Sequence, residues 1–293
     1  MPRTLLIDVP ENFSFRSTVY SHGWCELLPF ELDDENWRLS YVFSDAGNGK
    51  HSPGVMYEND GKVVIELANA KVPDVKVLAD ARHILRLDDD LTDFYGKLTQ
   101  NETLAWVSEK SAGRMLRSPT VWEDLVKTLC TTNCSWALTK IMVRNLVEKL
   151  GSPAGRGKFA FPTPQTMARM PEQFYRDEIR AGYRSPYFIE LAESVTSGKL
   201  DPEAWLHSEL STPELKKEIK SVKGCGDYAA ENLLKLLGRY DGLALDSWLR
   251  SQFYKKHNRE KVCNDKKIER HYSKYAEWRG LAIWCDMTER WIV

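Results

Sequence analysis

The chain has 293 residues, of which 42% are hydrophobic and 10 are tryptophan, so it can bury a substantial core in one large domain or two smaller ones. Its 41 Lys and Arg residues are balanced by 42 Asp and Glu residues, and the formal net charge is −1. This balance excludes a protein that binds nucleic acid through overall positive charge, so any such contact needs a local basic patch.

Cysteine usage favours a reduced, intracellular compartment. The six cysteines are scattered, and neither a secretory signal nor an apolar run of membrane-spanning length is present. Cys130 and Cys134 can share a helix face, but no second pair or nearby histidine completes a zinc set, so we interpret them as buried thiols.

The first part of the chain has the sequence pattern of short β-strands separated by turns. Strand patterns cover residues 19–30, 37–43, 54–57 and 62–67, and Asn59-Asp60-Gly61 between the last two indicates a hairpin. From Asp93 the pattern becomes helical, with Pro, Ser or Thr at several expected helix starts. The expected helices cover residues 120–150, 164–179, 186–197, 213–222, 228–238, 247–257 and 272–284.

The predicted fold class is therefore α+β. A small antiparallel β domain is expected over residues 1–92, followed by a mostly α-helical domain over residues 93–293.

The stretch from Ser221 to Arg250 is the most informative part of the sequence. A turn at Gly224-Cys225-Gly226 leads into an amphipathic helix that Gly238 closes. Free backbone N–H groups at a helix N-terminus form an anion site, for which a backbone phosphate of nucleic acid is a candidate. Taken alone, the turn could equally be an ordinary entry into a helix.

Asp246 is the second unusual feature of this stretch, because it is an acid between apolar neighbours such as Leu245 and Trp248. One interpretation is an N-cap for a helix that begins at Ser247. The other is a functional carboxylate.

Together, the glycine hairpin, its helix and the following aspartate resemble the helix-hairpin-helix (HhH-GPD) DNA glycosylases of base excision repair. In that family, main-chain N–H groups of the hairpin hold the DNA backbone. The aspartate stabilises positive charge on the sugar as the base leaves. Catalysis is therefore expected at Asp246, and DNA contacts at Lys223, Gly224, Cys225 and Gly226.

Three more stretches extend the resemblance. Residues 129–136 look like the 8-oxoguanine branch segment whose asparagine, here Asn133, fills the space left by an extruded nucleotide. Residues 181–187 resemble the wedge loop, in which Tyr183 would intrude beside the lesion and Arg184 would reach the orphaned base. Residues 86–95 resemble the junction between the two family domains. Without this context, Asn133 would be interpreted as a helix surface amide or a helix break.

The chain also departs from the family pattern. Tyr228 stands where bifunctional members carry the lysine that forms a Schiff base, and Lys223 replaces the usual hairpin proline. We therefore expect a monofunctional enzyme that uses water and lacks lyase activity. The cysteine cluster of the iron–sulfur branch is missing, and Trp248 stands where the 8-oxoguanine branch has a histidine, so Tyr228 and Trp248 are the expected base-pocket residues.

The resemblance implies no required cofactor and no iron–sulfur cluster. It does imply a structural Na⁺ or K⁺ ion on main-chain carbonyls that match Lys220, Val222 and Cys225. The expected partner is double-stranded DNA with a damaged base, bound by a monomer without membrane association. The compartment would be the cytoplasm in a prokaryote and the nucleus in a eukaryote.

The resemblance leaves the lesion open. The filling and wedge segments favour 8-oxoguanine, while the missing lysine and Trp248 favour an alkylated purine of the 3-methyladenine type. We place 8-oxoguanine slightly ahead. The alternative from another class is a non-catalytic damage-binding protein with the same fold, against which the retained Asp246 argues.

Overall fold

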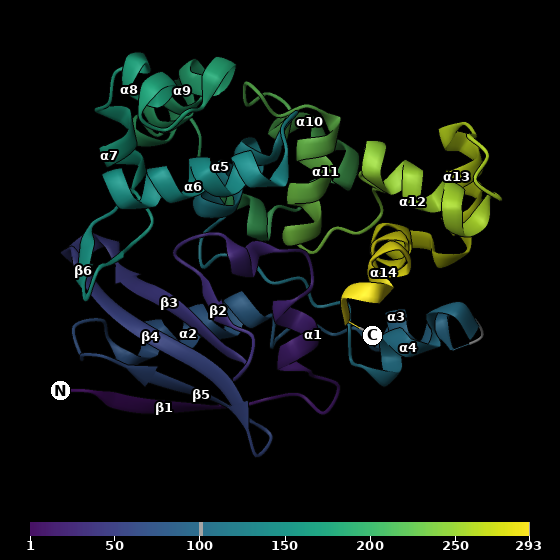
Figure 1. The fold of residues 1–293 in the computed structure, drawn as a ribbon, viewed down its shortest axis with the longest axis horizontal. Helices are drawn as coiled ribbons and strands as arrows, with labels where there is room; N and C mark the ends of the chain where they lie inside the picture. The colour runs from purple at the N-terminus through teal and green to yellow at the C-terminus, as the bar shows by residue number, and fades with distance from the viewer. Residues whose placement is uncertain (100–101, 293) are drawn as a thin grey trace.

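A five-stranded antiparallel sheet forms the N-terminal part of the computed structural model, which describes residues 1–99 and 102–292 (Figure 1). The strand order is β1-β5-β4-β3-β2. The strands are β1 (Arg3–Asp8), β2 (Glu31–Asp33), β3 (Arg38–Asp45), β4 (Lys50–Asn59) and β5 (Lys62–Leu67).

The hairpin between β4 and β5 confirms the prediction at Asn59-Asp60-Gly61. Asn59 pairs with Lys62, and the two turn residues, Asp60 and Gly61, have φ angles of 49° and 70°. Two positive φ angles are the signature of the type I′ turn, which matches the twist of paired strands.

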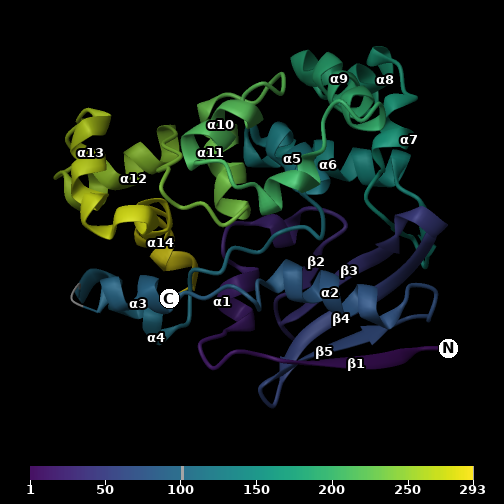
Figure 2. The same cartoon turned by 180° about the vertical axis from the view of Figure 1, so that it is seen from behind.

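The N-terminal prediction placed one strand wrongly and missed several elements, among them the short edge strand β2. Residues 19–30 do not form a strand, because they follow the short helix α1 (Phe15–Val19), capped by Ser14, and contain the 3-10 turn η1 (Trp24–Glu26). The edge strand β1 was missed. Helix α2 (Asp74–Leu85) was also missed, and it packs against the sheet with Val77, Ala81 and Ile84 buried (Figure 2).

The expected helix over residues 120–150 is two helices, α5 (Val121–Thr131) and α6 (Trp136–Leu150). Asn133, at φ 46°, lies in the break, and the Ser135 side chain caps the second helix. Asparagine tolerates the left-handed region better than most residues, and serine is a preferred N-cap, so the break has a local cause.

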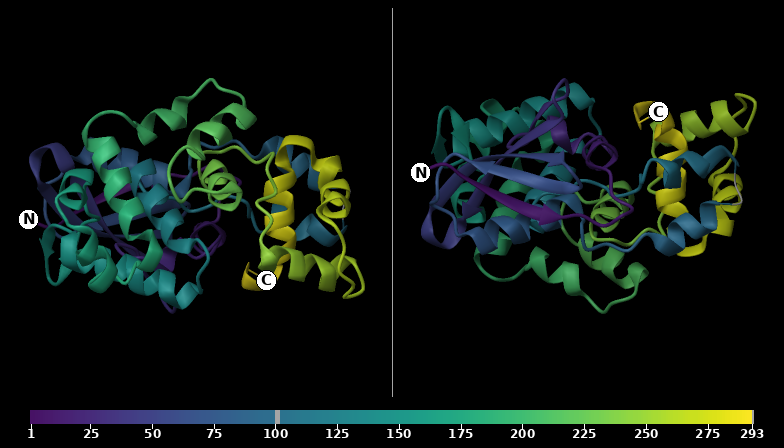
Figure 3. Two further views of the ribbon diagram at one scale, coloured as in Figure 1. Left: turned by 90° about the horizontal axis from the view of Figure 1, so that it is seen from above. Right: turned by 90° about the horizontal axis from the view of Figure 1, so that it is seen from below.

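Helices α3 (Thr92–Leu98) and α4 (Ala105–Glu109) lie beside the C-terminal helices although they follow the sheet in the chain (Figure 3). The expected helix over residues 272–284 is instead a 3-10 segment, η6 (Ser273–Trp278), followed by α14 (Arg279–Ile292). The other elements are η2 (Ala46–Asn48), η3 (Glu102–Leu104), β6 (Pro153–Gly155), β7 (Lys158–Phe159), α7 (Pro164–Ala168), α8 (Glu172–Asp177), η4 (Gly182–Arg184), α9 (Ser185–Thr196), η5 (Pro202–His207), α10 (Thr212–Ile219), α11 (Asp227–Leu236), α12 (Ser247–His257) and α13 (Asp265–Tyr272).

The α+β class is thereby confirmed, with an antiparallel sheet first and helices after it. Among the described residues, no helix combines the length and apolarity that crossing a membrane requires.

Buried charges join the sheet to the helical body. Glu123 on α5 accepts hydrogen bonds from Tyr41 of β3 at 2.7 Å and from Lys127 at 2.6 Å. The neighbouring Asp124 accepts from the Trp24 indole at 2.7 Å and from the backbone N–H of Ser118 at 2.9 Å. Burial raises the pKa of Asp124 from 3.8 to about 6, although these hydrogen bonds oppose the shift.

The raised pKa of Asp124 makes the stability of the protein depend on pH. Between pH 3.8 and about pH 6, the unfolded chain loses the Asp124 proton while the folded protein keeps it, so stability falls as pH rises. Because asparagine has no proton to lose, the free energy of unfolding of Asp124→Asn should fall by up to about 3 kcal/mol less over this pH range. Urea unfolding of both proteins at pH 4.5, 5.5 and 7 measures it. Parallel pH profiles for the two proteins would contradict the assignment.

Candidate active site

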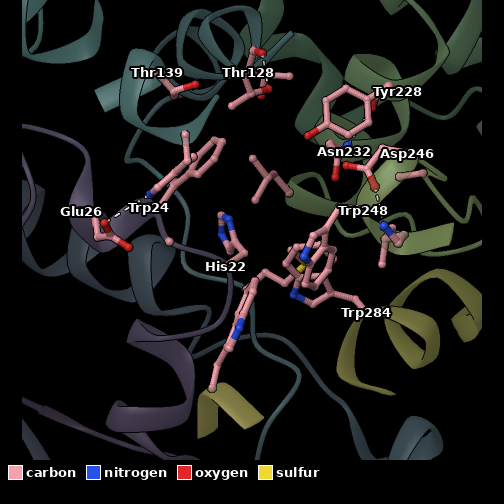
Figure 4. Close-up of a pocket in the computed structure, with 18 of the residues that line it drawn as sticks. His22, Trp24, Glu26, Thr128, Thr139, Tyr228, Asn232, Asp246, Trp248 and Trp284 are labelled. Atoms are coloured by element: carbon pink, nitrogen blue, oxygen red, sulfur yellow. Dashed lines mark hydrogen bonds between the residues drawn. The ribbon is translucent and has the colours of Figure 1, made fainter. Parts of the chain in front are cut away.

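A pocket of about 700 Å³ opens between η1, the α5–α6 break, α11, α12 and α14 (Figure 4). Aromatic rings dominate its walls, and the described lining contains neither lysine nor arginine. The residues that line it include Trp24, Tyr228, Asp246, Trp248, Trp284 and Trp291.

Asp246 is both the N-cap of α12 and part of the pocket wall. Its Oδ1 accepts a hydrogen bond from the backbone N–H of Leu249 at 2.7 Å, and its backbone is extended. The cap fixes the direction of the carboxylate, and the helix N-terminus favours its negative charge. In Figure 4, Asp246 lies beside Tyr228 and Asn232 and above Trp248.

Tyr228 occupies the first turn of α11 and lines the same pocket. Burial, and next the negative charge of Asp246, raise the pKa of its phenol, so the ring stays neutral near neutral pH. Trp248 lies with its ring centroid 5.5 Å from that of Trp291 and 6.2 Å from that of Trp284. The two predicted base-pocket residues therefore line one cavity.

The hairpin places its glycines in different surroundings. Gly224 has φ 91°, and a Cβ there would lie 2.7 Å from the Tyr187 ring and 3.1 Å from Leu129. Gly226 has open space around it and is exposed at the start of α11, while Cys225 is buried. Gly224 is thus required for packing, and Gly226 leaves room for an outside group.

Lys223 is exposed on the hairpin and forms an ion pair with Glu190 at 3.1 Å. The carbonyl of Val222, one of the three expected cation ligands, accepts a hydrogen bond from the N–H of Cys225 at 3.0 Å. A carbonyl oxygen has a second lone pair, so this turn bond is compatible with an ion. The cation at Lys220, Val222 and Cys225 stays a prediction.

Asn133 and Tyr183 come from distant parts of the chain and meet at the surface. The Asn133 amide lies 3.3 Å from the Tyr183 hydroxyl, and the Tyr183 side chain is 49% exposed. Neighbours of Asn133 on the α5–α6 break, Thr131 and Cys134, line the pocket. The expected filling and wedge residues therefore form one exposed pair.

Arg184 does not project outward as its expected role requires. It is 3% exposed, its Nε donates to Thr132 Oγ1 at 3.1 Å, and its guanidinium lies 4.5 Å from the centre of the Tyr183 ring. In a 3-10 turn, successive side chains point about 120° apart. Because the Tyr183 side chain points to the surface, the next side chain, that of Arg184, points into the protein. In this conformation, Arg184 supports the tyrosine.

Several pocket residues were missed because residues 19–30 were assigned to a strand. His22 and Trp24 line the pocket, and burial lowers the pKa of His22 to about 4, so its ring is neutral. The Asp124 bond described above fixes the Trp24 indole. Asn232, one turn after Tyr228 on α11, also lines the pocket and could have been found from its helical spacing.

One cluster outside the pocket has the donor types of a metal site. The ligand atoms of His257, His271 and Asp286 lie within 4.8 Å of one another. However, Asp286 Oδ2 already accepts from His257 at 2.7 Å and Tyr272 at 2.6 Å, and Lys256 lies 2.8 Å from Oδ1. Protein donors thus satisfy Oδ2, and Oδ1 has the Lys256 ammonium beside it without a hydrogen bond, so the charge of the carboxylate is balanced by protein groups.

No family model and no curated protein matches the sequence. Solved structures do match the fold. "MBOgg1", in complex with a low-affinity DNA ligand, has a TM-score of 0.78 at 19% identity, covering 98% of this chain and 96% of that one. The 8-oxoguanine glycosylase/lyase of Clostridium acetobutylicum gives 0.76 at 17%, covering 98% and 97%.

The 3-methyladenine DNA-glycosylase of Archaeoglobus fulgidus gives 0.75 at 17%, covering 98% of both chains. These three structures extend over nearly the whole chain, so the predicted helix-hairpin-helix glycosylase fold is confirmed. The separate roles of the site residues stay predictions.

The two hairpin glycines allow a matched stability test. Gly224→Ala should lower the free energy of unfolding by about 1–3 kcal/mol, because the new Cβ combines a left-handed backbone with a clash. Gly226→Ala, at φ −79° and in open space, should change it by less than about 1 kcal/mol. Equal losses in urea unfolding would contradict this assignment.

Proposed function

We propose that the protein is a DNA glycosylase of base excision repair, which hydrolyses the N-glycosidic bond of a damaged purine flipped out of duplex DNA. The observation that carries this proposal is the position of Asp246, a capped carboxylate in the wall of an aromatic pocket directly after a glycine hairpin and its helix. The similar structures named above include glycosylases for two damaged bases, and one of them, MBOgg1, is a complex with a DNA ligand.

The first requirement of the reaction is extrusion of the base. Flipping a nucleotide out of a duplex costs a few kcal/mol, which contacts with the distorted DNA must offset. The exposed pair of Asn133 and Tyr183 supplies an amide and a ring for the vacated space, and Arg184 holds the ring from beneath. The N–H groups of Gly226 and of the first turn of α11 would bind a backbone phosphate.

Bond cleavage is the second requirement. As the base departs, positive charge develops on the deoxyribose, and a fixed carboxylate beside it lowers the barrier. Asp246 is such a carboxylate, and the indoles of Trp248 and Trp284 form apolar walls of the same pocket. The carboxylate would also orient the water that attacks the sugar.

We propose that the enzyme is monofunctional. A Schiff base needs an amine at the sugar, whereas Tyr228 stands at the position that carries the family's lysine, and its phenol stays protonated. Borohydride should therefore trap no covalent adduct with DNA, and strand breaks at the product site should appear only after alkali.

For the lesion, we place 8-oxoguanine first. A neutral His22, the Asn232 amide and the Thr128 hydroxyl, which has no partner among the described residues, offer hydrogen bonds to the polar edge of an oxidised purine. The second candidate is a cationic alkylated purine. The indole walls, the Asp246 carboxylate and the lack of lysine or arginine in the described lining favour a base with positive charge.

The remaining proposals follow from this activity. The partner would be duplex DNA with one damaged base, bound by a monomer in the compartment that holds the DNA. A Na⁺ or K⁺ ion at the carbonyls of Lys220, Val222 and Cys225 would join the hairpin to a phosphate, and no redox cofactor is required.

Asp246→Asn tests the proposal against duplexes that carry 8-oxoguanine, 3-methyladenine, hypoxanthine or uracil. Single-turnover excision should fall by about 10²-fold or more while duplex affinity is retained, because the charge is lost and the amide still caps α12. Asp241→Asn, in the same loop, is the matched control and should excise at the wild-type rate.

Binding of a lesion duplex without release of any base, in wild type and mutant alike, would identify a damage-binding protein instead. Preferential release of 3-methyladenine would assign the alkylated-purine alternative.

A further inference from the structure

Ala244 holds a backbone conformation that alanine rarely adopts. Its φ is 52°, in the left-handed region, and its side chain is fully buried shortly before Asp246. The left-handed conformation costs an L-residue about 1–2 kcal/mol, so it persists only where the surroundings impose it. The question is which contacts impose it here.

Two side chains of α11 hold both polar atoms of one peptide group. The Glu231 carboxylate accepts a hydrogen bond from the N–H of Ala244, and the Lys235 Nζ donates to the carbonyl of Leu243 at 3.2 Å. That carbonyl and that N–H belong to the same peptide plane. Because Glu231 and Lys235 are one helical turn apart, they hold the plane from one helix face.

Burial of the charged Lys235 amine has a considerable desolvation cost. Its side chain is 0% exposed, and its hydrogen bond to the Leu243 carbonyl is the only one recorded for the amine in the described chain. Burial lowers its pKa to about 8, against the opposing charges of Glu231 and Asp246, so the amine is still protonated at neutral pH. The Trp284 ring, which also lines the pocket, lies 5.5 Å away.

The part of this loop before Leu243 is held by close backbone contacts with α14. The N–H of Gly280 donates to the Tyr240 carbonyl at 2.6 Å, and a Cβ on Gly280 would lie 2.0 Å from the carbonyl oxygen of Gly242. The loop thus rests on the backbone of α14. Among the described residues, the peptide between Leu243 and Ala244 is the last one before Asp246 that side chains hold by hydrogen bonds.

We propose that Glu231 and Lys235 are positioning residues for Asp246, which clamp the Leu243–Ala244 peptide so that the carboxylate points into the pocket. The proposal rests on the proposed glycosylase function for its effect on catalysis. The clamp itself is a property of the fold and has a readout of its own. A displacement of about 1 Å at a reacting group can lower a rate 10²-fold, so small changes at the clamp are measurable.

The test uses Lys235→Met, which removes the donor but keeps the chain length, and Glu231→Ala, which removes the acceptor. Glu231→Gln keeps an acceptor oxygen and serves as the conservative rescue. Lys127→Met is the control for loss of a buried lysine, because Lys127 is also 0% exposed but pairs with Glu123 at the sheet.

Two quantities are measured on each folded variant below its unfolding temperature. Amide hydrogen exchange over residues 243–249 should become at least about 10-fold faster in Lys235→Met and Glu231→Ala, and stay unchanged in Glu231→Gln and Lys127→Met. Single-turnover excision should fall at least about 10-fold in the first two with duplex affinity unchanged, and by less than about 3-fold in the others.

Unchanged exchange in Lys235→Met and Glu231→Ala would overturn the clamp, whatever the protein acts on. Faster exchange with wild-type excision would overturn the positioning role. Faster exchange in a protein whose wild type excises no lesion would instead count against the proposed function and leave the clamp standing. A fall in excision equal to that of Lys127→Met would assign the effect to lost stability.

Discussion

The carboxylate of Asp246 has to meet two demands at once, and the rest of the site is arranged around them. As the N-cap of α12 it must accept from the N–H of Leu249, and as part of the pocket wall it must stay accessible. The cap interpretation and the functional interpretation of this residue are therefore compatible. Capping locks the side-chain rotamer, which is the pre-organisation that charge stabilisation in a transition state requires.

The N-terminal sheet contributes to the pocket through the segment that follows α1. Trp24 lines the pocket and is held by Asp124 of α5, while the Trp284 indole of α14 donates to the carbonyl of Ser21 at 2.8 Å. The first and last parts of the chain are thus joined at the pocket.

Local rules predicted the local features. The β4–β5 turn, the helix from Ser247 to His257 and the cap at Asp246 each depend on neighbouring residues, so the sequence was sufficient. The inward turn of Arg184 depends on a contact with Thr132, 52 residues earlier, and the burial of Lys235 depends on a contact with Leu243, beyond the end of its own helix. Hydrophobic periodicity carries no information about such contacts.

Charge compensation around the hairpin limits how this site can hold an anion. The flanking lysines Lys216 and Lys220 both lie 3.0 Å from Asp227, the first residue of α11, and Lys223 pairs with Glu190. A phosphate would have to compete with these carboxylates for the lysines. Binding would therefore release few counterions from the DNA. Affinity would then depend mainly on main-chain N–H groups, the exposed Tyr183 ring and the pocket, and would be less sensitive to salt than in a basic DNA-binding protein.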